Sequence, residues 1–171
     1  MVARLSPTVA RAAYEKVCKS KQEVCGSFDL IGGELVPKNC FDGYVEGGRY
    51  VCERKISTVT PFTFHTHIWD SPGYPSTEDL LTLVEEDKTL DVIYTCWGVW
   101  VVSVKEPVNK QNVADTLHVS ISPFNGGVDR LKKLSRRVES AISTFIKIMK
   151  ENNYNIRFYS WRNLKPIKIT F

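Results

Sequence analysis

The stretch Leu90–Val104, LDVIYTCWGVWVVSV, is a long and almost uniformly apolar run. Apolar runs without regular polar alternation are typical of strands that lie inside a sheet with both faces covered. We therefore expect one strand here, at the centre of the fold.

The sequence around this run alternates between strand and helix patterns. Ser6-Pro7 is typical of a helix start, and Gly32-Gly33 is typical of the end of a strand. The alternation predicts an α/β or α+β fold, with helices packed on a sheet. The expected helices cover residues 6–20, 77–86 and 128–151, and the expected strands cover residues 23–31, 50–52, 55–67 and 116–122. A loop or irregular hairpin is expected at 35–49, and terminal strands or an ordered tail at 155–161 and 167–171.

The composition is that of an ordinary globular protein. The chain has 171 residues, of which 43% are hydrophobic and 25% charged, and this length predicts a single domain over residues 1–171. The net charge of +4 is far weaker than that of a dedicated nucleic-acid-binding protein. We therefore regard nucleic acid as an unlikely partner.

The cysteines and the apolar segments bear on the compartment. The five cysteines include no Cys-x-x-Cys pair, and an odd number cannot be fully paired within the chain, so we expect them to be reduced. The N-terminal residues do not resemble a signal peptide, and no apolar run approaches the roughly 20 residues needed to span a bilayer. The sequence therefore predicts a cytoplasmic protein, or one assembled in a cytosolic setting, without a membrane partner.

Two histidines end the strand expected at 55–67. His65 and His67 are two residues apart, so on an extended backbone both imidazoles project from one face. Asp79 follows in the first turn of the next expected helix and can supply a carboxylate. Two imidazoles and one carboxylate leave a tetrahedral Zn²⁺ one open position, which is the pattern of catalytic rather than structural zinc sites.

The same residues also have ordinary structural interpretations. A His-x-His pair is by itself weak support for a metal site, because histidine has several common roles. Ser76 and Asp79 match a helix capping box, with serine at the N-cap and an acidic residue at N3. The capping and metal-binding interpretations are compatible with each other.

These segments together resemble the JAB/MPN domain family with its JAMM zinc-metalloprotease motif. That motif is a glutamate near the start of an early strand, then His-x-His, then Ser-x-x-Asp. Glu23 in Glu23-Val24-Cys25-Gly26 resembles the glutamate segment, and His65-Thr66-His67 and Ser76-Thr77-Glu78-Asp79 resemble the other two. The resemblance covers about residues 6–122 and implies a cytidine-deaminase-like, three-layer arrangement of a mixed central sheet flanked by helices.

The resemblance implies a zinc-dependent peptidase or isopeptidase that acts on a protein, with ubiquitin or a ubiquitin-like modifier as one candidate. His65, His67 and Asp79 would hold the Zn²⁺ ion. Glu23 would be the general base and Ser76 would donate a hydrogen bond to the oxyanion.

The segment between His67 and Ser76 differs from the family pattern. Ile68 stands where the family usually has proline, and the segment is one residue longer than the usual seven. If Asp79 were displaced, Asp70 would be the alternative ligand. Because this loop begins at a ligand, we expect the aromatic side chains of Trp69 and Tyr74 to line a cleft beside the metal.

The alternatives belong to two other classes of function. One is a JAB/MPN-fold scaffold or structural protein with little catalytic activity, in a larger protein assembly or in a virion. The other is a nucleobase deaminase, which needs His-x-Glu followed by Pro-Cys-x-x-Cys. The sequence contains neither deaminase element, which excludes that class.

Overall fold

The computed structural model describes residues 2–15, 23–42, 44–46, 49–51, 61–67, 73–104, 138–163 and 165–170. The strand expected at 116–122 and the first part of the expected long helix, residues 128–137, lie outside these ranges. The elements in chain order are β1 (Val2–Leu5), α1 (Pro7–Glu15), β2 (Val24–Ile31), β3 (Glu34–Asp42), β4 (Tyr44–Glu46), β5 (Arg49–Val51), β6 (Phe62–His67), α2 (Thr77–Glu85), β7 (Leu90–Thr95), β8 (Gly98–Val104), α4 (Val138–Glu151), β9 (Tyr154–Ser160), the short 3-10 helix η4 (Trp161–Asn163) and β10 (Ile167–Thr170).

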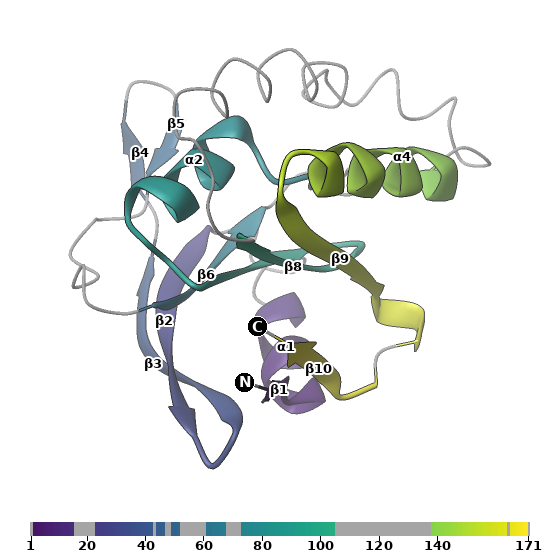
Figure 1. Ribbon diagram of the computed structural model, residues 1–171. Coiled ribbons are helices and arrows are strands. Elements are labelled where there is room, and N and C mark those ends of the chain that lie inside the picture. Colours follow the sequence, from purple (N-terminus) through teal and green to yellow (C-terminus); the bar gives the residue numbers. More distant parts are fainter. Residues whose placement is uncertain are drawn as a thin grey trace.

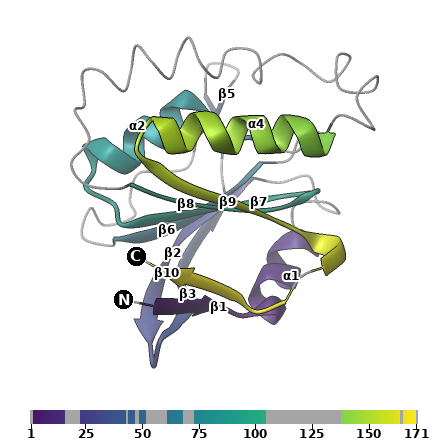
Figure 2. The ribbon, with the colours of Figure 1, turned by 45° about the vertical axis from the view of Figure 1, so that its right-hand side comes forward.

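Eight of the described strands form one mixed sheet in the order β10-β1-β3-β2-β6-β7-β8-β9. The pairs β1–β3 and β6–β7 are parallel, and the other neighbours are antiparallel. Figures 1 and 2 show α2 and α4 on one side of strands β6–β9 and α1 on the other. The expected fold class, a sheet flanked by helices, is confirmed at this level.

The alternation of side chains along the strands divides the core into two clusters. Phe64 and Tyr94 belong to the cluster on the α1 side, with their ring centroids 6.0 Å apart. Ile93 and Trp100 belong to the cluster under α2 and α4, where Trp100 packs on Phe145 of α4 at a centroid distance of 5.5 Å. β6 and β7 are therefore covered on both faces of the sheet.

The apolar run Leu90–Val104 forms two strands, so the prediction of a single strand is wrong. β7 and β8 pair antiparallel, and the turn between them is held by Thr95, whose Oγ1 accepts the N–H groups of Trp97 and Gly98 at 3.1 Å each. A Cβ at Gly98 would lie 2.6 Å from Cζ of Phe158, so a larger residue does not fit there. The turn is invisible in the pattern because its residues are as apolar as the strands.

Residues 35–49, expected to be a loop or irregular hairpin, largely form strands, so the loop alternative is wrong and the hairpin alternative fits better. β3 pairs with β2 from one end to the other, and β4 and β5 form a separate two-stranded hairpin. Pro37 is accommodated because the β2–β3 register shifts between Ser27 and Phe28, and an irregularity of this kind tolerates a residue that cannot donate a ladder hydrogen bond. β1 was also not expected, since four residues are too few for a periodic signal.

Candidate metal centre

Strand β6 places both histidines on the face of the sheet that carries α2. His65 lies beside Cys25 of β2 and beside Ile93 of β7. Ile93 belongs to the cluster under α2 and α4, and neighbouring residues across a sheet share a face. The imidazoles of His65 and His67 therefore project toward the start of α2, as their spacing predicted.

The start of α2 brings the third predicted ligand to the same place. Ser76 is the N-cap residue, and its Oγ accepts the N–H of Asp79 at 3.1 Å. In return, the N–H of Ser76 donates to Oδ2 of Asp79 at 2.6 Å. This reciprocal pair is the predicted capping box, and it fixes the carboxylate of Asp79 at the N-terminus of the helix.

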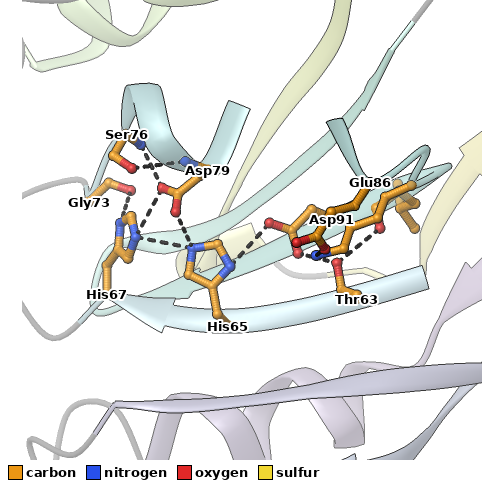
Figure 3. A network of polar contacts seen from close by, with 10 residues as sticks. Thr63, His65, His67, Gly73, Ser76, Asp79, Glu86 and Asp91 are labelled. Carbon is orange, nitrogen blue, oxygen red and sulfur yellow. Dashed lines mark hydrogen bonds and ion pairs between the residues drawn. The ribbon is translucent and has the colours of Figure 1, made fainter. Parts of the chain in front are cut away.

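The atoms of these three side chains converge as shown in Figure 3. Nε2 of His65 and Nε2 of His67 are 3.1 Å apart. The carboxylate of Asp79 places Oδ1 3.3 Å from Nε2 of His65 and Oδ2 3.3 Å from Nε2 of His67. Ligand atoms about 2.0–2.2 Å from one tetrahedral ion are about 3.3–3.6 Å apart, so these three side chains could hold one metal ion.

The contacts of the two Nδ1 atoms determine which nitrogen of each imidazole carries a proton and which carries a lone pair. Nδ1 of His67 lies 3.2 Å from the carbonyl oxygen of Gly73, which can only accept, so Nδ1 carries the proton. Nδ1 of His65 lies 3.1 Å from Oδ2 of Asp91, a carboxylate that also accepts. Each Nε2 atom then directs its lone pair toward the other Nε2 atom. A cation bound between the two nitrogens removes the repulsion between these lone pairs.

Charge balance favours a divalent cation in the same position. Burial raises the pKa of Asp79, but the imidazoles of His65 and His67 outweigh burial and hold it well below its usual range. Burial also raises the pKa of Asp91, and His65 again outweighs burial and lowers it. Two carboxylates are thus ionised beside two imidazoles, and an ion of charge +2 neutralises a cluster that is expensive to bury unpaired.

Without the ion, a proton on His65 neutralises part of the negative charge of the two carboxylates. Burial lowers the pKa of His65, but the carboxylates of Asp91 and Asp79 outweigh burial and hold that pKa well above its usual range. A protonated His65 cannot ligate a metal, so metal uptake by the folded protein should release a proton.

The raised pKa of His65 predicts how the stability of the metal-free protein depends on pH. A folded-state pKa above the unfolded value stabilises the fold fully below about pH 6.5, and this contribution is lost as pH rises through the folded-state pKa. Urea denaturation with a chelator, repeated from pH 6 upward, should show a falling free energy of unfolding. The variant His65→Gln should lack this component, and an identical decline in both proteins would assign it to other groups.

Glu23 lies at the edge of the centre and immediately precedes β2. Cys25 is paired with His65, so the same register places Glu23 opposite His67. Burial raises the pKa of Glu23, and the nearby His67 and His65 offset this only in part. All five site residues predicted from the sequence therefore gather at the junction of β2, β6 and α2.

Two contacts of the centre were missed in the sequence. Asp91 is 7% exposed in the middle of apolar β7, and its Oδ1 accepts the hydroxyl of Thr63 at 2.9 Å. A single acidic residue in an apolar strand was the available signal. The carbonyl of Gly73 gave no signal, because a backbone contact leaves no trace in the residue type.

Gly73 approaches the centre more closely than another residue could. Its φ is +57°, and a Cβ there would lie 2.6 Å from Cγ2 of Thr95 and 3.1 Å from Cβ of His67. Gly32 has a φ of +58° with no atom within 4 Å of its Cβ position, so it is a matched control for backbone strain alone.

We expect Gly73→Ala to be more destabilising than Gly32→Ala. Each substitution costs roughly 1–2 kcal/mol of left-handed backbone strain, and Gly73→Ala adds a clash that displaces His67. Urea denaturation and a zinc titration of both variants measure this. Equal losses of stability with unchanged zinc affinity would show that the close contact at Gly73 has no influence on the centre.

The expected aromatic wall of the cleft is wrong for Tyr74. The residue is 8% exposed, and its ring packs on Trp100 and Phe145 with centroid distances of 5.5 and 4.9 Å. Tyr74 is therefore a core residue that anchors the chain before α2. Trp69 and Asp70 lie outside the described residues, so their predicted roles remain predictions.

The expectation of reduced cysteines is wrong for two of the five. Cys25 and Cys96 are disulfide-bonded. Cys18, Cys52 and the side chain of Cys40 lie outside the described part of the chain. A disulfide leaves no pattern in this sequence, since odd counts and irregular spacing do not specify a pairing.

Comparison with known proteins identifies no relative. No protein-family model, curated protein or solved structure matches the chain. Within the described ranges, none of the helices is both long and apolar enough to cross a bilayer.

Proposed function

We propose that this protein is a JAMM-type zinc metallopeptidase or isopeptidase built on a JAB/MPN-like fold. One observation carries the proposal: two imidazole Nε2 atoms and a carboxylate lie 3.1–3.3 Å from one another. His65, His67 and Asp79 would hold the ion through these atoms. Three protein ligands leave one coordination position open, which distinguishes a catalytic zinc site from a structural one with four.

The residues around the ion have separable tasks. When bound, zinc lowers the pKa of a coordinated water toward neutrality and polarises a substrate carbonyl. Glu23, whose pKa burial raises, would accept the proton from the attacking water and pass it to the leaving amine. Ser76 accepts a hydrogen bond from Asp79 N–H through Oγ, and its own O–H can donate to the oxyanion.

The position of Glu23 supports this assignment over another carboxylate of the sequence. Glu34 lies opposite Ile31, at the other end of β2. Because a strand rises about 3.3 Å per residue, β2 separates Glu34 from the centre by roughly 20 Å or more. Glu53 lies outside the described residues, which leaves Glu23 as the candidate that the geometry favours.

The substrate we propose is a protein, with a ubiquitin-like modifier as one candidate. The runner-up is a scaffold of the same fold in a larger assembly, including a virion. Disulfides are rare in reducing cytosol and persist on virion surfaces and in other oxidising compartments. The bonded state of Cys25 and Cys96 therefore weighs against the expected cytoplasmic location and fits the virion alternative.

The test is metal content followed by hydrolysis. Protein purified without chelator should contain one equivalent of zinc per chain, measured by elemental mass spectrometry. It should also cleave members of a library of peptide and isopeptide substrates, and it should lose that activity in a chelator. Stoichiometric zinc without hydrolysis of any substrate favours the scaffold, and a wild-type protein that never binds zinc removes the metallopeptidase proposal.

A further inference from the structure

We infer that Asp91, held by Thr63, is a positioning residue that fixes the orientation and tautomer of His65 for metal binding. This inference rests on the proposed metal centre. Asp91 is not a candidate ligand, because its carboxylate contacts Nδ1 of His65, whereas the proposed metal-binding atom is Nε2. Asp91 would therefore affect the metal only through His65.

The contacts of Asp91 use both of its oxygens. Oδ2 lies 3.1 Å from Nδ1 of His65, and Oδ1 accepts the hydroxyl of Thr63 at 2.9 Å. Thr63 and His65 are two residues apart on β6, and Asp91 lies opposite Thr63 on β7. The carboxylate is thus clamped by two side chains of the neighbouring strand, as Figure 3 shows.

The burial of Asp91 indicates that its contacts with His65 and Thr63 do more than fill space in the core. Asp91 is 7% exposed, and its neighbours along β7, Leu90 and Val92, are fully buried. An ionised carboxylate at such a position is costly unless it is paired, and an apolar residue would pack there without that cost. Its presence is explained if His65 requires a negatively charged acceptor.

A carboxylate acceptor changes what His65 can do. It fixes the proton on Nδ1, which keeps the Nε2 lone pair available, and it makes the imidazole a stronger donor to a metal. His67 receives only a neutral carbonyl, that of Gly73. The two histidines are therefore unequal, and removal of the charge at Asp91 should affect His65 selectively.

The test compares Asp91→Asn with Asp29→Asn. Asn has nearly the shape of Asp, but it has no charge and replaces one acceptor oxygen with an amide donor. Asp29 is an exposed carboxylate paired with Lys38 at 3.1 Å. Asp91→Asn should weaken zinc and cobalt binding by roughly 10–100-fold, and Asp29→Asn should leave it unchanged. Thr63→Val, which frees one oxygen of Asp91, should give a smaller loss in the same direction.

Two spectroscopic readouts separate positioning from general structure. Nitrogen-15 NMR of the neutral imidazoles should place the proton of His65 on Nδ1 in the wild type and in Asp29→Asn. This preference should be lost in Asp91→Asn, and His67 should be unchanged. The visible spectrum of the cobalt-loaded protein should shift in Asp91→Asn, because the geometry of one ligand has relaxed.

The outcomes distinguish this inference from the proposed function. Wild-type affinity and an unchanged His65 proton in Asp91→Asn would overturn the inference while leaving the metallopeptidase intact. If the wild type binds neither zinc nor cobalt, the proposed function fails, and the NMR of the metal-free protein still decides whether Asp91 sets the tautomer. If Asp91→Asn does not fold, Thr63→Val decides the question by the same two measurements.

Discussion

Glu23→Gln should retain its zinc and lose 10²–10⁴-fold in kcat, which is the typical contribution of a positioned general base. The amide is nearly isosteric with the carboxylate and no ligand is removed, so the fold and the metal should persist. The loss should fall on kcat rather than KM, because proton transfer matters in the transition state more than in substrate binding. Zinc content and the single-turnover rate are the two quantities to measure.

Glu34→Gln is the matched control for this substitution, since it makes the same chemical change on an exposed residue of β3 that lies opposite the far end of β2. It should leave both quantities at the wild-type level. Loss of zinc from Glu23→Gln would make Glu23 a ligand. Full activity in Glu23→Gln would transfer the role of base to another carboxylate, such as Glu53.

His67→Ala should lose zinc and activity together, because only His65 and Asp79 would remain to hold the ion. The effect on stability should depend on zinc. At a zinc concentration of 100 Kd the wild type gains about 2.7 kcal/mol of unfolding free energy from binding, and His67→Ala should gain almost none at the same concentration.

The control for His67→Ala is the wild type in a chelator. Without metal, the two proteins should unfold at similar urea concentrations, apart from the packing lost with the imidazole. A variant that still shows the zinc-dependent increase in Tm would mean that His67 is not a ligand. The pair of Tm values, with and without zinc, therefore tests ligation independently of any substrate.

The sequence predicted the parts of the centre that depend on local rules. His65 and His67 share a face because strand side chains alternate, and Ser76 and Asp79 meet because a capping box is formed by residues three apart. The additional residue between His67 and Ser76 does not displace Asp79. These predictions needed no knowledge of tertiary contacts.

The features that the sequence missed depend on contacts between distant segments. The contact of Asp91 with His65 exists because β6 and β7 are parallel neighbours in a particular register. The β7–β8 turn and the burial of Tyr74 are likewise set by tertiary packing. A residue-type pattern carries little information about such contacts, and hydrophobicity alone made Leu90–Val104 look continuous.

The parallel pairing of β6 and β7 around α2 has a consequence for the order in which the protein assembles. These three consecutive elements form one crossover unit, and it contains His65, His67, Asp79 and Asp91. Glu23 comes from outside this unit and reaches the centre only when β2 pairs with β6. Under the proposed function, a partly folded chain with the crossover formed would have the ligands for an ion before it had the general base, and hydrolysis would begin only when β2 docks.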